Sequence, residues 1–278
     1  MCGRFVSTSS PTELAERFVV DEVAVTNDRP NYNVAPRARV MIVRERCGGD
    51  GPGGDGPGGA ESAGDGERHR VLSRVRWGLV PSWAKDPGIG DRLINARAET
   101  VAEKPSFRSA FVKRRCIIPV DGFYEWKVVG PPSSPKGRPK KQPIYIHRLD
   151  DEPMAFAGLW EAWKVPDGVD LPDNILDDAP DDRDRDGDGD GWLRSCVIVT
   201  TSANARLAPV HDRMPVVLPA SAWEQWLDPD EHDRDALGAL LAPAPDEWFE
   251  TYPVSTRVNR VVNNDPGLLT PVPAAPMS

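Results

Sequence analysis

Apolar and polar residues alternate with a period of two over much of this chain, which is the pattern of β-strands with one buried face. Residues 122–126 place Phe123 and Glu125 on one face and Tyr124 and Trp126 on the other. Short continuous apolar runs are typical of strands buried on both faces. The predicted strands span residues 40–43, 71–77, 116–120, 122–126, 144–148, 154–163, 196–201, 216–218 and 249–254.

Helical segments are fewer and short. Ser10, Pro11 and Glu13 form a capping box with proline at the first helical position, which predicts a helix as far as Phe18. Further helices are expected at residues 105–112, 221–227 and 231–241, and residues 202–204 predict the start of another.

Two low-complexity segments interrupt the pattern, at residues 47–66 and 166–191. Both are dominated by small and polar residues, and neither can bury enough apolar surface to offset the entropy lost on ordering. We interpret them as surface insertions, the first between two strands. A basic, proline-rich loop is expected at 131–143. The chain therefore predicts a single domain over residues 1–272, followed by a tail at 273–278.

The 278 residues carry a net charge of −9, which argues against a general nucleic-acid binder. Many acids lie within residues 167–190, however, and bases cluster at 113–115 and 136–141, which we interpret as solvated surface. The four cysteines lack the paired spacing of zinc or disulfide frameworks. No signal peptide or membrane-spanning apolar run is present, so the expected location is cytoplasmic.

The first residues, Met1 to Phe5, offer distinctive chemistry. Removal of Met1 would leave Cys2 with a free α-amine next to its thiol, and both titrate near neutrality, at about 8 and about 8.5. Such a 1,2-aminothiol condenses with an aldehyde to an imine, which the thiol then closes into a thiazolidine. Gly3 allows a ligand to approach the backbone, and Arg4 carries a phosphate-binding fork. Alternatively, Cys2 is an ordinary small apolar residue.

Several other polar and aromatic residues have two interpretations each. Asn33 is either a turn former or a polar contact in a cleft. Trp77 and Trp83 flank a turn that contains a proline, and they serve either as core residues or as a platform for an unpaired base.

A second polar group lies along residues 93–99. If this segment is extended, Asn95, Arg97 and Glu99 share one face, and they must either satisfy each other or bind something. Glu125 is flanked by aromatic residues and is either functional or solvent-facing. Among the four histidines only His211 stands beside other candidate functional groups, in the sequence His-Asp-Arg-Met-Pro.

The candidate segments occur in one order along the chain: residues 1–5 (MCGRF), 32–36 (YNVAP), 77–83 (WGLVPSW), 93–99 (LINARAE), 121–126 (DGFYEW), 197–204 (VIVTTSAN) and 211–215 (HDRMP). In this combination the chain resembles the SOS-response-associated peptidase family, the abasic-site processing proteins. The resemblance runs from Cys2 to about Val272. Only the two insertions depart from it, and the family pattern does not require them.

The resemblance implies an α+β fold with a mixed, mostly antiparallel, barrel-like β-sheet core, short flanking helices and a groove for single-stranded DNA. It also implies that the protein removes its own Met1 in a peptidase-type reaction. Cys2 then forms a thiazolidine cross-link with the aldehyde of an abasic site, which shields the lesion during the DNA damage response. A latent DNA lyase activity is expected from the imine. We expect a monomer without metal or organic cofactor or membrane partner, bound to abasic single-stranded DNA and so associated with the nucleoid.

Position by position, the resemblance assigns the catalytic roles to Cys2, Asn95, Glu125 and His211. His211 is suited to open the sugar ring near neutral pH, and Glu125 is suited to relay protons during imine formation. Asn95 is suited to hold the sugar oxygen or the adduct. The predicted DNA-binding residues are Arg4, Asn33, Trp77, Trp83, Arg97, Thr200 and Arg213.

Two other classes of function remain open. Class II glutamine amidotransferases also begin Met-Cys-Gly, so an N-terminal-nucleophile amidohydrolase is one alternative. It does not explain the segments at 93–99 and 211–215. The other alternative is a non-covalent reader of modified bases in DNA, which would need no terminal amine.

Overall fold

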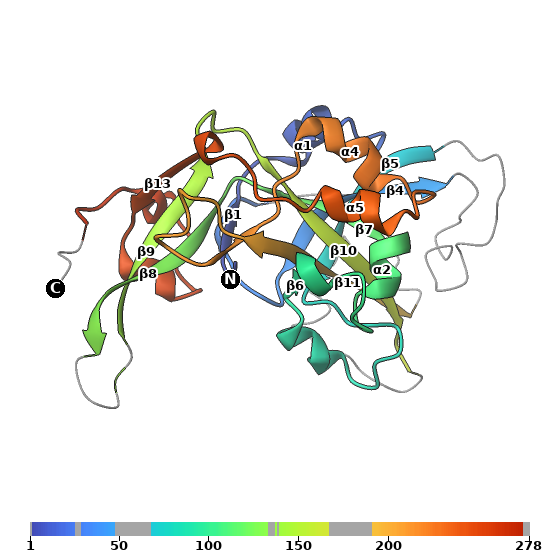
Figure 1. Ribbon diagram of the computed structural model, residues 1–278, viewed down its shortest axis with the longest axis horizontal. Helices are drawn as coiled ribbons and strands as arrows, with labels where there is room; N and C mark the ends of the chain where they lie inside the picture. The colour runs from blue at the N-terminus through green and yellow to red at the C-terminus, as the bar shows by residue number, and fades with distance from the viewer. Residues whose placement is uncertain are drawn as a thin grey trace.

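The structure is a computed structural model that describes residues 2–25, 29–47, 68–132, 137, 139–166 and 191–274. The central parts of both predicted insertions lie outside these residues. The strands form two sheets, and the N-terminus of the chain lies between them (Figure 1). The expected α+β fold with a mostly antiparallel, barrel-like core is confirmed.

The larger sheet contains a closed ring of five strands. Neighbours follow the order β11-β10-β7-β4-β5, and a parallel pairing of β5 with β11 closes the ring. All other neighbours in the ring are antiparallel. These strands are β4 (Arg39–Cys47), β5 (Arg68–Trp77), β7 (Arg115–Val120), β10 (Met154–Lys164) and β11 (Trp192–Ser202). The short strands β2 (Glu22–Val23), β6 (Asn95–Arg97) and β12 (Arg213–Pro215) extend this sheet.

The second sheet is antiparallel throughout, in the order β13-β9-β8-β1-β3. Its strands are β1 (Phe5–Ser7), β3 (Asn31–Val34), β8 (Gly122–Pro132), β9 (Pro139–Arg148) and β13 (Phe249–Pro253). Phe5 and Phe123 face the barrel and join its apolar interior. Tyr124 and Trp126 face the opposite way, against residues of the C-terminal segment such as Val258. The predicted separation of faces along residues 123–126 is confirmed for these aromatic side chains.

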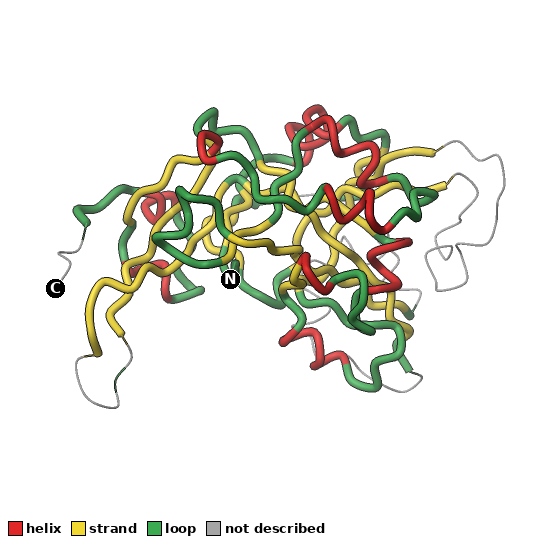
Figure 2. The backbone as a smooth tube through the Cα atoms, viewed as in Figure 1, coloured by secondary structure: helices red, strands yellow, loops and turns green. Residues whose placement is uncertain are grey.

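Short helices cover the outside of the barrel (Figure 2). They are α1 (Pro11–Phe18), α2 (Arg108–Lys113), α4 (Trp223–Leu227) and α5 (Arg234–Ala239). The predicted capping box of α1 is confirmed, because Glu13 N–H donates to Ser10 Oγ at 3.2 Å and Ser10 N–H donates to Glu13 Oε2 at 2.7 Å. Within the described ranges, none of the helices is long and apolar enough to cross a membrane.

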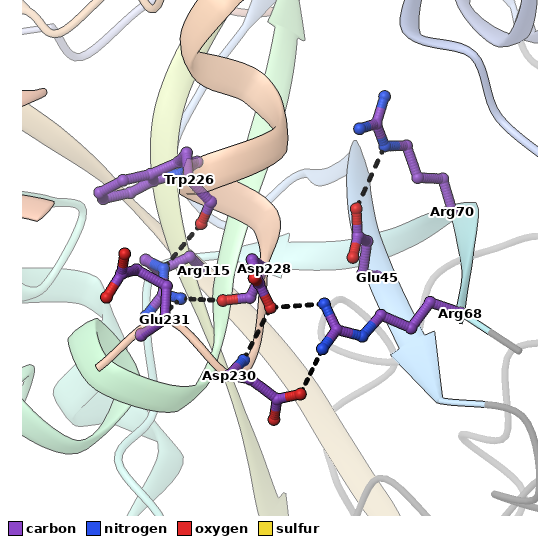
Figure 3. A network of polar contacts seen from close by, with 8 residues as sticks. All are labelled: Glu45, Arg68, Arg70, Arg115, Trp226, Asp228, Asp230 and Glu231. Carbon is purple, nitrogen blue, oxygen red and sulfur yellow. Dashed lines mark hydrogen bonds and ion pairs between the residues drawn. The ribbon is translucent and has the colours of Figure 1, made fainter. Parts of the chain in front are cut away.

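The side chain of Arg115 joins the barrel to two of these helices by hydrogen bonds (Figure 3). Its guanidinium donates to the carbonyl oxygens of Phe111, Val112, Trp226, Asp228 and Glu231. Only 4% of the residue is exposed, and burial lowers its pKa to about 10, so it stays charged at neutral pH. The prediction that residues 113–115 form solvated surface is therefore wrong for Arg115. Periodicity cannot reveal this role in full, because the carbonyls of Trp226, Asp228 and Glu231 lie more than 100 residues further along the chain.

Three predicted elements differ from the structure. Residues after Ser202 form hydrogen-bonded turns instead of a helix, and the Asn204 side chain accepts the Leu207 N–H at 3.0 Å. The strand expected at 216–218 lies earlier, at β12, and Val217 makes only an isolated bridge to Phe156. The loop expected at 131–143 is shorter, because β8 and β9 extend their pairing into it.

Candidate active site

Cys2 lies where the second sheet meets the barrel. Strand β1 pairs with β8 so that Phe5 is opposite Phe123, and the pairing continues toward the N-terminus with Tyr124 N–H donating to Arg4 O at 2.9 Å. Continuing this antiparallel register by two residues brings Gly3 opposite Glu125. The second sheet therefore brings the start of the chain beside the predicted proton relay.

Cys2, Asn95 and Glu125 form a group that we name the inner site. Asn95 Nδ2 donates to the Cys2 carbonyl at 2.8 Å, across 93 positions of sequence. Cys2 is fully buried and Glu125 is 4% exposed. Burial raises the pKa of the Cys2 thiol far above its usual range, and the negative charge of Glu125 raises it further. The thiol is therefore protonated at neutral pH.

The side-chain oxygen of Asn95, Oδ1, accepts no hydrogen bond from the described residues. Its strand β6 pairs in parallel with β11, Asn95 opposite Ile198, so the backbone of Asn95 is fixed by the barrel. Its Oδ1 is buried and has no hydrogen-bond partner among the described residues. A buried acceptor left without a donor costs about 1–3 kcal/mol, and such groups require an explanation. A donor on a bound substrate would satisfy it.

Arg97, Glu99, Thr200 and Arg213 form a second group, which we name the arginine rim. Thr200 on β11 is paired with Arg97 of β6 on one side and with Pro215 of β12 on the other. Arg213 reaches across to donate to Thr200 O at 2.6 Å, and it forms a two-point ion pair with Glu99. Arg97 is exposed, and its guanidinium makes no hydrogen bond or ion pair with the residues that the structure describes. Its charge is available to an anionic ligand.

His211 lies two residues before Arg213, on the approach to β12. Its Nδ1 accepts the Arg213 N–H at 3.0 Å and also lies 2.8 Å from Asp212 Oδ1. Nδ1 thus faces both a donor, the Arg213 N–H, and an acceptor, the Asp212 carboxylate, and a proton on Nδ1 would be donated to Asp212. The side chain is 30% exposed, so the ring can exchange protons with solvent.

Arg4 and Asn33 hold the C-terminal segment against the strand that follows Cys2. Arg4 Nη1 donates to Asn33 Oδ1 at 2.7 Å and to Val258 O at 2.8 Å. The Asn33 amide is 2% exposed and donates to the carbonyls of Val258, Arg260 and Asn263. No pattern in the sequence indicated that this segment contributes to the site. Because it is joined through backbone carbonyls, its own side chains carry no signal of the contact.

The two tryptophans of residues 77–83 occupy different environments. Trp77 is fully buried, packs on Phe5 at a ring-centroid distance of 5.0 Å and donates from Nε1 to Ile94 O at 2.9 Å. Of its two predicted roles, the structure shows that of a core residue. Trp83 is 58% exposed and has a face available for stacking. Elsewhere, no cluster of three His, Cys, Asp or Glu side chains that could hold a metal occurs among the described residues.

A family model described as SOS response associated peptidase (SRAP) matches residues 1–261. The chain belongs to the SOS response associated peptidase family. This settles the family resemblance that the ordered segments indicated, and the match runs through both the inner site and the arginine rim.

Relatives within the SRAP family are named abasic site processing proteins. YoqW of Bacillus subtilis is 37% identical over 97% of this chain and 99% of its own length, and YedK of Escherichia coli is 30% identical over 98% and 100%. HMCES of Gallus gallus is 30% identical over 88% of this chain and 67% of its own. A crystal structure of a Bacteroides thetaiotaomicron protein aligns with a TM-score of 0.68 at 22% identity, over 98% of this chain and all of the other, which shows a shared fold.

Proposed function

We propose that this protein processes abasic sites in single-stranded DNA, and that it does so by forming a covalent cross-link through Cys2 once Met1 has been removed. The observation that carries the proposal is the inner site, where Asn95 and Glu125 converge on Cys2 from separate parts of the chain. Its relatives are named abasic site processing proteins, which supports DNA with an abasic site as the substrate. The match of the family model supports a role in the response to DNA damage.

The chemistry requires both groups of Cys2. The opened deoxyribose of an abasic site carries an aldehyde, and the Cys2 amine adds to its carbon and expels water to give an imine. The thiol sulfur then bonds to the same carbon, the C=N bond becomes single, and the thiol proton is passed to nitrogen. One aldehyde and one aminothiol thus give a thiazolidine and one water. If the imine instead promotes loss of the 3′ phosphate, the result is strand cleavage, which is the latent lyase activity.

The inner site fits this order of steps. The Cys2 thiol is neutral at rest, so the amine attacks first and the thiol is kept from premature reaction. Glu125, whose charge acts on that thiol, can take the thiol proton and return it to nitrogen. Oδ1 of Asn95, which has no donor among the described residues, can accept a hydrogen bond from the sugar hydroxyl that ring opening releases. His211, whose partly exposed ring lies beside Arg213 and Asp212, is assigned the ring opening.

The DNA-contacting residues divide into direct and supporting ones in this proposal. Arg97 and Arg213 bind phosphates and Trp83 stacks on a base next to the lesion. Thr200 orients Arg213 through its carbonyl. Asn33 and Trp77 act indirectly, Asn33 by orienting Arg4 and Trp77 by supporting Phe5. Phosphate contacts set position without reading sequence, as expected for a lesion that has no base.

Intact-mass measurement tests the proposal most directly. Purified protein is incubated with a single-stranded oligonucleotide that carries one abasic site. We expect a protein without Met1 and an adduct equal to the sum of both masses minus one water. A variant with an extra, unremoved residue before Cys2 should form no adduct, because only a terminal Cys is an aminothiol.

Cys2→Ala is the matched control for the second step. It keeps the terminal amine, so it should form an imine that borohydride traps and should cleave the strand, but no heat-stable adduct should appear without borohydride. An extended chain that cross-links at the normal rate would overturn the role of the Cys2 aminothiol. Binding of abasic DNA without an adduct, equal in the wild type and the extended chain, would favour a non-covalent reader.

A further inference from the structure

The guanidinium of Arg213 is already occupied by a carboxylate of its own chain. Both Nη atoms donate to Glu99, the Nη2–Oε2 distance being 2.9 Å, and Nη2 also donates to Thr200 O at 2.6 Å. The remaining Nε is buried without a partner among the described residues. Arg213 therefore cannot offer a free two-point fork to a phosphate while Glu99 stays in place.

Of the two partners, Glu99 is the one that can move. The Arg213 side chain is only 14% exposed and is anchored to Thr200 O, a backbone atom within the β6-β11-β12 pairing. The Glu99 side chain is 49% exposed and follows the end of β6, in a single 3₁₀ turn over Ala98–Thr100. Loss of the ion pair would therefore free Glu99 and leave Arg213 in position.

Glu99 also lies within the electrostatic reach of Arg97. The hydrogen bonds from Arg213 are the largest cause that lowers the pKa of Glu99, and the charge of Arg97 lowers it further. One carboxylate thus neutralises part of the charge of both arginines of the rim. A phosphate group has the same charge sign and the same two-oxygen geometry toward an arginine fork.

We propose that Glu99 is an internal competitor for DNA phosphate, which holds Arg213 in the free protein and is displaced when a single strand binds. The proposal rests on the function proposed above, because it assumes that the arginine rim faces a DNA strand. Glu99 thereby limits the affinity for undamaged single strands, so that retention on DNA depends more on the covalent step at Cys2. It is a positioning and affinity-setting residue, with no part in the chemistry of the adduct.

The test uses Glu99→Gln, which removes the charge and keeps the shape, and an oligonucleotide without an abasic site. Binding is measured by fluorescence anisotropy over a series of salt concentrations. We expect the variant to bind about two- to fivefold more tightly at low salt, the scale of one exposed charge interaction. The slope of log K against log salt should become steeper by up to about 0.7, the value for one phosphate contact on a single strand, because Arg213 of the variant meets the phosphate without giving up an ion pair of its own chain.

Glu152→Gln is the matched control, because Glu152 forms a comparable single ion pair with Arg17 and its side chain is 51% exposed. It changes the net charge of the protein by the same amount and should leave binding within about twofold of the wild type. In an Arg213→Gln background, Glu99→Gln should lose most of its effect, which distinguishes action through Arg213 from a general charge effect.

The outcomes separate this proposal from the one on which it rests. If neither wild type nor variant binds single strands or cross-links abasic ones, the proposed function fails. If the wild type binds and cross-links but Glu99→Gln binds equally or more weakly, with an unchanged or shallower salt slope, Glu99 is an orienting partner of Arg213 and the competitor role is overturned. Equal tightening by Glu152→Gln would also overturn it.

Discussion

One strand of three residues, β6, contributes to both the inner site and the arginine rim, yet water reaches the two groups very differently. Asn95 holds the carbonyl of the fully buried Cys2, whereas Arg97, two positions along, is exposed. The inner site excludes water from groups that must exchange protons with one another in a fixed geometry. At the rim, Arg97 and Glu99 stay in contact with water, and the charge of the less exposed Arg213 is balanced by Glu99 until a ligand arrives. The residue that serves the chemistry, Asn95, and the residue that serves DNA affinity, Arg97, are thus only two positions apart on one strand.

The largest effect is expected at the inner site. Glu125→Gln keeps the shape of the side chain but cannot accept a proton, so single-turnover cross-linking should slow by about 10²–10⁴-fold without loss of DNA affinity. His211→Gln should slow the reaction within the same range, but the deficit should shrink with a substrate whose aldehyde cannot close into a ring. Rates are measured by denaturing gel at saturating oligonucleotide.

Glu161→Gln is the control for Glu125→Gln, because Glu161 is equally buried, at 3% exposure, and is paired with Arg114 on the barrel. It should leave the rate of cross-linking unchanged, whatever it does to thermal stability. Undiminished strand cleavage by the double variant Cys2→Ala/Glu125→Gln would assign the proton relay to another residue, with His211 the first candidate.

A second effect concerns stability at high pH and depends on burial alone. Burial raises the pKa values of the Cys2, Cys116 and Cys196 thiols above the ordinary range. In the unfolded chain these thiols ionise near ~8.5, so stability is complete below that pH and is lost above it. Each buried thiol should lower the unfolding free energy by up to about 1.4 kcal/mol per pH unit.

Denaturant unfolding between pH 7 and pH 10 measures this loss, and Cys2→Ala should remove about one third of the slope if all three thiols contribute equally.

At the rim, the unfolding free energy should depend on pH in the opposite direction. The pKa of Glu99 is lowered by Arg213, so its contribution to stability is present above the unfolded pKa and is lost as the pH falls toward the folded one. For the thiols, an unfolding free energy that does not change above pH 8 would contradict their burial.

The smallest effect is expected at the rim. Arg97→Gln should weaken binding of a single-stranded oligonucleotide by a few-fold and reduce the salt slope by about 0.7, because one phosphate contact is lost. The cross-linking rate at saturating DNA should not change. Arg108→Gln, a change of an exposed arginine on α2, is the control and should leave both quantities as they are. A changed saturated rate in Arg97→Gln would mean that the rim and the inner site are not separable.

Local features of the fold were predictable because their causes lie within a few residues. The capping box of α1 joins Ser10 to Glu13, and the two faces of residues 123–126 follow from the geometry of any strand. Prediction failed for two different reasons. At Asn204 the local hydrogen bond to the Leu207 N–H is of the kind that starts a helix, but the chain continues as turns. Arg115 is buried because distant carbonyls accept from its guanidinium.

The sequence by itself determined the long strands of the barrel, the family and the residue types with reactive chemistry, Cys2, Glu125 and His211 among them, since these follow from periodicity, order and functional groups. Only the tertiary structure decided which of these residues meet. That Asn95 binds the Cys2 carbonyl, that Trp77 is in the core and that Glu99 occupies Arg213 instead of Arg97 depend on how sheets close and pack. The physical reason is that such contacts join residues about a hundred positions apart, and side-chain periodicity specifies which face a residue takes but not what lies opposite it.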